Sequence, residues 1–282
     1  MSTMTRRFVA VGYDGSEHAM RAVEVATTEA LRRGLPLRII TAVDVFPYDT
    51  LAAFHDSGGD TLAATARASA RLVEVADRLQ VEHRALDVTT RAHGMSPGAL
   101  LVDESTGADL LVIGQHHGGP LGSLSDALAA HARCPVLVVR TGGQPDGPIV
   151  LGVDGSEIGE RAMEFAFEEA QLLGATIEAV HTYQPWSYAD MPPARTQGDE
   201  EEERLLAESL AGWSGKYPDV RVEKVLRRDR AATALVEASS RARLVVVGSR
   251  GRGGFSGLLL GSVSRTVLHT AACSVAVVRA VR

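Results

Sequence analysis

The chain contains an internal repeat, and this repeat restricts its fold more than any other feature. The segment VGYDGS at 11–16 recurs as LGVDGS at 151–156. Near the other end of each copy, ARCPVLVVR at 132–140 recurs as AACSVAVVR at 271–279. A repeat unit of about 140 residues is a normal domain size, so we expect each copy to fold around its own core.

The repeat predicts two tandem domains, at residues 1–141 and 148–282. The segment between them, TGGQPDGP at 141–148, is rich in Gly and Pro, which is typical of a linker. Of the 282 residues 45% are hydrophobic, which is enough to build a core in each domain.

Charge and sequence pattern exclude several classes of protein. A net charge of −6 does not favour a nucleic-acid-binding surface. No apolar stretch reaches the roughly 18 to 20 residues that span a bilayer, and the N-terminal segment lacks the apolar region of a signal peptide. Cys134 and Cys273 lie at equivalent positions before the last strand of each copy, and we interpret them as small buried residues. We therefore expect a cytoplasmic protein with neither a membrane nor a nucleic acid as partner.

Each copy alternates short apolar runs with longer helical patterns. In the second copy we expect strands at 148–153, 176–182, 220–226, 243–248 and 274–279, and helices at 157–173, 199–216, 230–241 and 262–272. The strands lack the alternation of apolar and polar residues, which favours a parallel sheet covered on both faces. The fold class is therefore α/β, with a doubly wound parallel sheet in each copy. In such sheets ligands bind at the C-terminal ends of the strands.

A glycine-rich loop follows one of these buried strands. The strand LVVV at 244–247 leads into GSRGRGGFSGLLLGS at 248–262, and a helical pattern follows. Backbone N–H groups and the positive end of the helix then face one small volume, which is an anion-binding arrangement. We expect the glycines to supply positive φ angles and room for a phosphate, and Ser262 to be the N-cap of the helix. For one glycine alone, a plain turn would be the better explanation.

The spacing G-x2-G-x9-G-S of Gly248, Gly251, Gly261 and Ser262, with DGS after the first strand, resembles the universal stress protein family. The resemblance covers the whole chain, as two tandem family domains. It implies five parallel strands in the order 3-2-1-4-5 in each domain and pairing of domains through their last strands. In this chain that pairing would make an intramolecular pseudo-dimer, with a further homodimer left open. The motif marks the branch of the family that binds ATP.

The resemblance also implies roles for individual residues of the second domain. Gly152 and Asp154 would lie near the adenosine and the metal–phosphate region, and Thr182 would border the adenine. Val247 and Gly248 would lie against the ribose and base. The residues that would contact the phosphates through N–H and hydroxyl groups are Gly251, Gly261, Ser262, Val263 and Ser264. The arginines that add positive charge nearby are Arg250, Arg252 and Arg265.

Asp154 has two interpretations, which the sequence leaves open. It either contacts the ligand and its Mg²⁺, or it forms the turn at the start of the helix DGSEIGERA. His181 is equally open, as a residue that lines the pocket or as an ordinary strand end. The run DEEEE at 199–203 is interpreted as a solvated helix start, and the loop at 191–198 as a lid or partner contact.

The first copy departs from the motif. Its loop GQHHGGPLGS keeps Gly114, Gly122 and Ser123, but His117 replaces the second glycine and Gly122 falls five residues too early. The loop is therefore shorter, and Pro120 removes an N–H donor. We interpret His116 and His117 as a polar loop pair rather than metal ligands. Asp14 and Ala42, the counterparts of Asp154 and Thr182, complete a weaker site, so ATP is expected mainly in the second domain.

The predicted function is ATP-dependent regulation in a stress response, through a protein partner that the sequence does not identify. Neither a G-x4-GK[ST] phosphate loop nor a G-x-S-x-G nucleophile motif is present in the sequence. Catalysis is therefore not expected beyond slow ATP hydrolysis, with Asp154 holding Mg²⁺. The alternative from another class is a protein-interaction module that needs no nucleotide.

Overall fold

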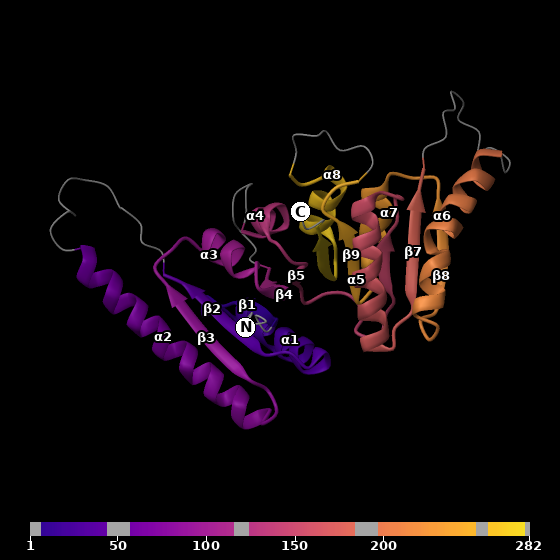
Figure 1. The fold of residues 1–282 in the computed structure, drawn as a ribbon. Helices are drawn as coiled ribbons and strands as arrows, with labels where there is room; N and C mark the ends of the chain where they lie inside the picture. The colour runs from indigo at the N-terminus through magenta and orange to yellow at the C-terminus, as the bar shows by residue number, and fades with distance from the viewer. Residues whose placement is uncertain (1–6, 44–56, 116–123, 184–196, 252–258, 280–282) are drawn as a thin grey trace, which may run out of the picture. The chain divides into compact units, whose positions relative to one another are not determined.

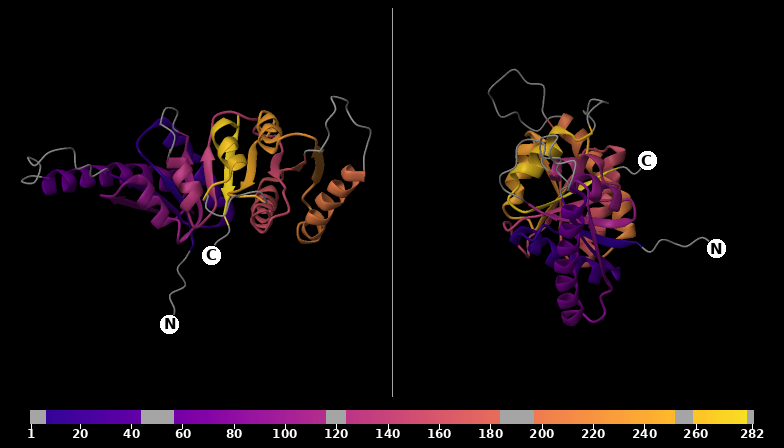
Figure 2. Two further views of the ribbon diagram at one scale, coloured as in Figure 1. Left: turned by 90° about the horizontal axis from the view of Figure 1, so that it is seen from above. Right: turned by 90° about the vertical axis from the view of Figure 1, so that its left-hand side faces the viewer.

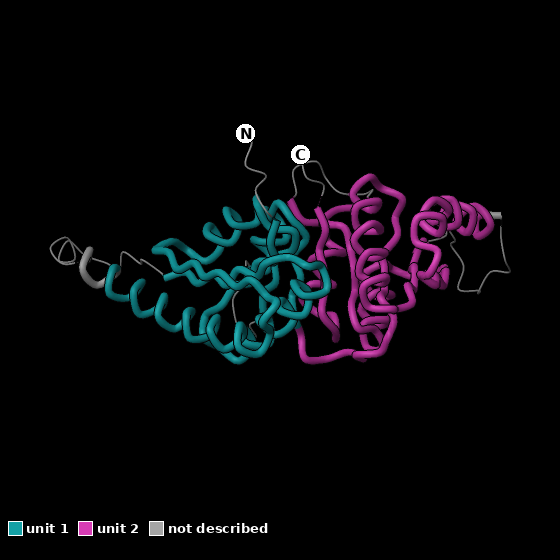
Figure 3. Tube along the Cα trace, turned by 60° about the horizontal axis from the view of Figure 1, so that its bottom comes forward, with its two compact units in different colours: residues 1–139 teal, residues 140–282 magenta. Residues whose placement is uncertain are grey.

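The structure is a computed structural model that describes residues 7–43, 57–115, 124–183, 197–251 and 259–279 (Figure 1, Figure 2). Several residues considered above lie outside these ranges: Gly122, Ser123 and Arg252, together with His116, His117, Pro120 and residues 191–196. The chain forms two compact units, residues 1–139 and 140–282 (Figure 3).

Unit 1 is a five-stranded parallel sheet with four described helices. Its elements are β1 (Phe8–Gly12), α1 (Glu17–Arg33), β2 (Leu37–Ala42), α2 (Ser57–Glu82), β3 (Val88–His93), α3 (Pro97–Glu104), β4 (Ala108–Gly114), α4 (Leu124–His131) and β5 (Val136–Val139). The strands lie in the order β3-β2-β1-β4-β5, and all the pairings between them are parallel.

Unit 2 repeats this arrangement. Its elements are β6 (Ile149–Gly152), α5 (Glu157–Leu173), β7 (Ile177–Thr182), α6 (Gln197–Lys216), β8 (Val222–Arg227), α7 (Ala231–Ser239), β9 (Leu244–Gly248), α8 (Ser262–Thr270) and β10 (Ser274–Val278). The strand order is β8-β7-β6-β9-β10, again with parallel pairing. The predicted α/β class and the strand order 3-2-1-4-5 are confirmed in both units.

The core of each unit is its central sheet. In β1 and β9 the side chains of Val9, Val11, Val245 and Val246 are completely buried, as expected for strands covered on both faces. Figure 2 shows helices on both sides of the strands in each unit. In unit 2, α5 packs against α6, and α7 packs against α8. Among the described residues, no helix combines the length and the apolar character needed to cross a membrane.

The matching positions of the repeat are explained largely by helix ends. Ser16 and Ser156 are the N-caps of α1 and α5, and each hydroxyl accepts the N–H of the residue three positions later, at 3.1 Å. Both helices end at a glycine with positive φ, +63° at Gly34 and +60° at Gly174. The repeat therefore preserves the signals that start and stop the first helix of each unit.

The Gly- and Pro-rich segment between the two copies packs against unit 2. The Gln144 N–H donates to the Ala242 carbonyl at 2.9 Å, and Gly143 has a φ of +87°. A Cβ atom at Gly143 would lie 2.4 Å from the Cys273 Cβ and 2.5 Å from the Ala242 oxygen. Glycine is therefore required at position 143 both by its backbone angle and by the close approach of two other segments.

Both cysteines are buried and free, Cys134 in unit 1 and Cys273 in unit 2. Burial raises the pKa of the Cys134 thiol to about 12 and that of the Cys273 thiol to about 11, since the thiolate would lose its hydration. Each thiol therefore stays neutral and unreactive in the folded unit.

This burial predicts how the two thiols respond to a thiol reagent and to pH. We expect neither cysteine to react with an aromatic disulfide reagent at pH 8 until its own unit unfolds. Unfolded thiols ionise from about pH 8.5, so the stability that each buried thiol contributes is complete below that pH. It decreases as the pH rises towards the raised pKa values. Rapid labelling of either cysteine in the native protein would contradict this expectation.

Candidate functional site

A cavity of about 610 Å³ opens in unit 2, where β6, β7 and β9 end. Its lining brings together the ten principal residues predicted from the sequence: Gly152, Asp154, Thr182, Val247, Gly248, Gly251, Gly261, Ser262, Val263 and Ser264. Arg250 also lines it. Lining residues without a predicted contact are Val153, Val180, His181, Glu202, Ala231 and Leu235, of which His181 was left open above. A volume of this size is typical of a small-molecule site.

The position of the cavity follows from the topology of the sheet. The neighbouring strands β6 and β9 lead into α5 and α8, and these two helices belong to different helix pairs, α5 with α6 and α8 with α7. The chain therefore leaves the ends of β6 and β9 towards opposite faces of the sheet. A crevice results at this point, as it does in other doubly wound sheets.

Among the described glycines of the loop, Gly248 and Gly251 are required for space and not for their backbone angles. A Cβ atom at Gly251 would lie 2.4 Å from Asp154 Oδ2, and one at Gly248 would lie 3.0 Å from Ile158 Cγ2. At Gly261 the nearest atoms would be 3.4 Å away, which is an ordinary contact. None of the three has a positive φ, so the expectation of positive φ angles here was wrong. The loop stays close to Asp154 because Gly251 has no side chain.

Helix α8 begins at Ser262, as predicted, but its N-cap is a different residue from the one expected. Gly261 is its N-cap, with φ −73° and ψ 156°, and Ser262 is the first helical residue, so the prediction of Ser262 as N-cap was wrong. The Gly261 N–H donates to the Ser249 carbonyl at 2.7 Å, which fixes the start of the helix against the end of β9. Gly261 has no side chain to accept from the first-turn N–H groups. The first turn therefore faces the cavity without a side-chain cap, and an anion is its natural acceptor.

The side chain of Ser264 is already engaged within the protein. Its hydroxyl donates to the Gly248 carbonyl at 2.6 Å, and the residue is buried. This bond ties the first turn of α8 to the end of β9. The proton of the Ser264 hydroxyl is thus used for structure, while its oxygen still has a lone pair.

Asp154 forms the predicted turn and also lines the cavity. Its Oδ1 accepts the Ser156 N–H at 3.0 Å and the Ser156 hydroxyl at 2.7 Å, which forms the turn before α5. Its Oδ2 lies against Gly251. The same turn occurs in unit 1, where Asp14 Oδ1 accepts the Ser16 N–H at 2.9 Å. Within the described part of the chain, no three His, Cys, Asp or Glu side chains are grouped to hold a metal ion. A Mg²⁺ ion near Asp154 would therefore need phosphate oxygens as further ligands.

His181 and Glu202 form a polar pair in the cavity wall. His181 Nδ1 lies 2.7 Å from the Val153 carbonyl oxygen, and His181 Nε2 lies 2.7 Å from Glu202 Oε2. The interpretation of residues 199–203 as a solvated helix start was wrong for Glu202, which lines the cavity, and for Asp199, which is buried. The helical period could have revealed this, because Asp199, Glu202, Leu206 and Leu210 share one face of α6. Three of these four are buried, and Glu202 is half-buried.

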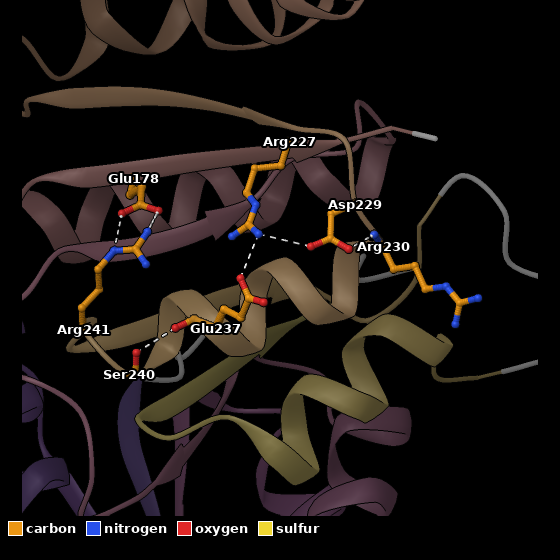
Figure 4. A network of polar contacts seen from close by, with 7 residues as sticks. All are labelled: Glu178, Arg227, Asp229, Arg230, Glu237, Ser240 and Arg241. Atoms are coloured by element: carbon orange, nitrogen blue, oxygen red, sulfur yellow. Dashed lines mark hydrogen bonds and ion pairs between the residues drawn. The ribbon is translucent and has the colours of Figure 1, made fainter. Parts of the chain in front are cut away.

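A network of charges holds α7 at the other wall of the cavity. Arg227 Nη2, at the end of β8, lies 2.8 Å from Glu237 Oε2 and 3.2 Å from Asp229 Oδ2 (Figure 4). Arg241, just after α7, donates to Glu178 of β7 through Nε at 3.3 Å. These contacts fix α7 against β7 and β8. Its residues Ala231 and Leu235 then form an apolar part of the lining.

The described residues of unit 1 enclose a much smaller cavity, of about 140 Å³. The predicted residues Asp14, Ala42 and Gly114 line it. A Cβ atom at Gly114 would lie only 2.3 Å from the His18 carbonyl oxygen, so the strand end packs directly against α1. The space is smaller than that of a typical ligand pocket.

Comparison with known proteins agrees with the repeat. The model of the universal stress protein family matches residues 5–140 and again residues 147–279. A universal stress protein of Mycobacterium tuberculosis is 37% identical, covering 96% of each chain, and one of Mycolicibacterium smegmatis is 37% identical, covering 99% of each. The crystal structure of a universal stress protein from Archaeoglobus fulgidus has a TM-score of 0.69, covering 96% of this chain and 97% of that one. At 18% identity, this last likeness is one of fold.

Proposed function

Because the chain belongs to the universal stress protein family and carries the family domain twice, we propose that it is a nucleotide-binding regulatory protein that holds ATP in unit 2. The proposal assigns the phosphates to the glycine loop and the start of α8. It assigns the nucleoside to the remainder of the cavity, beneath the ends of β6 and β7. The bound nucleotide would regulate contact with a protein partner in a stress response.

The observation that carries this proposal is the cavity of about 610 Å³ at the start of α8. There the first helical turn lacks a side-chain cap, and Gly251 lets the backbone of the loop lie against Asp154 in the lining. Arg250 adds a positive charge to the same wall. An anion bound at this place gains the helix dipole, the N–H groups and the arginine together. A triphosphate supplies that charge, and the apolar wall of Val180, Ala231 and Leu235 suits a base.

Binding without rapid hydrolysis fits this set of residues better than catalysis. Of the two carboxylates in the lining, Asp154 uses Oδ1 in the turn before α5, and Glu202 is paired with His181. Lysine is absent from the described lining, although many phosphoryl-transfer sites use one. We therefore assign these residues to binding and orientation of the nucleotide.

The proposal predicts that unit 2 releases nucleotide when it is denatured and that added nucleotide stabilises it against unfolding. Protein purified without added nucleotide and then heat-denatured should release adenine nucleotide, which chromatography identifies. After removal of nucleotide, millimolar Mg-ATP should raise the unfolding temperature, because a ligand at 100 times its Kd stabilises by about 2.7 kcal/mol. Both tryptophans, Trp186 and Trp213, lie in unit 2, so their fluorescence follows that unit.

Two further measurements separate the other functions. Absence of released nucleotide together with no thermal shift would contradict ATP binding and leave an interaction module that needs no nucleotide. Steady appearance of ADP that disappears in an Asp154→Ala variant would instead indicate a slow Mg-dependent ATPase.

A further inference from the structure

The His181–Glu202 pair leaves one carboxylate oxygen available to a ligand. The Val153 carbonyl can only accept a hydrogen bond, so His181 Nδ1 must carry a proton at their distance of 2.7 Å. One proton then lies between His181 Nε2 and Glu202 Oε2, which are also 2.7 Å apart. Oε1 of Glu202 has no partner among the described residues. The Glu202 side chain is 32% exposed and lines the cavity, so a ligand can reach this oxygen.

Unit 1 shows which part of this arrangement the fold itself needs. Thr41 occupies the position of His181 in the repeat, and its hydroxyl donates to the Tyr13 carbonyl at 2.6 Å. Tyr13 is the counterpart of Val153, so the same link joins the ends of the two strands in both units. A hydroxyl is therefore sufficient for the link. The second nitrogen of His181 makes a contact that the threonine of unit 1 lacks, because it holds Glu202 in place.

The pair lies at the end of the cavity away from the glycine loop. His181 and Glu202 belong to β7 and α6, whereas the loop and α8 follow β9, on the other side of β6. From β7 and α7 the lining also takes the apolar residues Val180, Ala231 and Leu235, beside the polar Thr182. If the phosphates bind at α8, the flat apolar base binds at this end of the cavity. The edge of the base then lies next to Glu202, which can accept a hydrogen bond from it.

We propose that Glu202 Oε1 accepts a hydrogen bond from the exocyclic amine of adenine, so that Glu202 determines base specificity and His181 positions it. This inference rests on the proposed nucleotide site of unit 2. Hypoxanthine has a carbonyl oxygen in place of the amine, and two acceptors would then face each other. Guanine offers two adjacent N–H donors that suit both oxygens of a carboxylate, but Oε2 is held by His181. The pair therefore favours adenine over both other purines.

The test compares the affinities of ATP, ITP and GTP by titration calorimetry on the full chain. In the wild-type protein, ATP should bind at least about tenfold more tightly than ITP or GTP. Glu202→Ala removes the acceptor, so the affinity for ATP should fall, ITP no longer meets an opposing acceptor, and the ratio of the two affinities should fall about tenfold or more. Glu201→Ala is the matched control, because Glu201 is an exposed neighbour on α6 outside the lining and should leave the ratio unchanged.

A second variant tests the positioning role and covers the case in which Glu202→Ala does not fold. His181→Thr installs the residue of unit 1, which retains the link to Val153 and releases Oε2 of Glu202. The affinity for GTP should then rise relative to that for ATP, with little change in unfolding temperature. An unchanged ratio of ATP affinity to ITP affinity in Glu202→Ala, or an equal loss of affinity for both nucleotides, overturns the inference while the nucleotide site stands. Failure of the wild-type protein to bind any of the three nucleotides overturns the proposed function as well.

Discussion

We expect the Gly251→Val variant to lose ATP binding by about 100-fold or more, which corresponds to about 2.7 kcal/mol. A Cβ atom at this position would lie 2.4 Å from Asp154 Oδ2, so either the loop or the carboxylate must move. The added side chain would also occupy the space at the start of α8, where the phosphates are proposed to bind. The measurement is calorimetric titration with Mg-ATP, together with the thermal shift that ATP produces.

The stability of this variant should change little, because Gly251 is exposed and has an ordinary φ. Gly212→Val is the matched control, since Gly212 is exposed on α6 and a Cβ atom there meets nothing within 4 Å. Wild-type affinity in Gly251→Val would show that the phosphates do not occupy this space. Gly261→Val should have a weaker effect than Gly251→Val, because a Cβ atom at Gly261 makes only ordinary contacts.

The Gly143→Ala variant should destabilise unit 2 by about 3 kcal/mol or more. The positive φ of +87° costs a residue with a side chain about 1–2 kcal/mol. The new Cβ atom would also lie 2.4 Å from the Cys273 Cβ and 2.5 Å from the Ala242 oxygen, and relief of such overpacking costs a further 1–3 kcal/mol or so. Tryptophan fluorescence during urea unfolding measures the effect on unit 2 alone.

Gly174→Ala separates the cost of a positive φ from the cost of the steric clash within the same unit. Its φ is also positive, at +60°, but a Cβ atom there meets nothing within 4 Å. This control should lose only about 1 kcal/mol, the cost of the backbone angle. Equal losses of unfolding free energy in the two variants would mean that the segment before β6 moves away from Cys273 without cost.

Much of the fold could be predicted from the sequence because the repeat supplies two examples of the same local rules. Ser156 and Gly174 start and stop α5 as Ser16 and Gly34 start and stop α1, so the helix ends are visible in the residues themselves. The uniformly apolar strands predicted a parallel sheet for the same reason, since neither face can be exposed.

The details of the site depend on contacts between distant segments, which the sequence does not show. The glycine spacing correctly placed the loop residues around one cavity, but the need for Gly251 comes from Asp154, almost a hundred residues earlier. The role of Glu202 was missed because a run of five acidic residues indicates solvent exposure. Only the packing of Leu206 and Leu210 in the core turns two of those residues, Asp199 and Glu202, inward.

The exchange of Thr41 for His181 illustrates how duplication gives a protein room to diverge. Both side chains make the same link between strand ends, so a mutation between them retains the hydrogen bond on which folding depends. The imidazole adds a second contact without removing the first. The contact with Glu202 is therefore separate from the link between the strand ends, so a substitution at this position can alter the ligand site of one unit while the edge of its sheet keeps its bond.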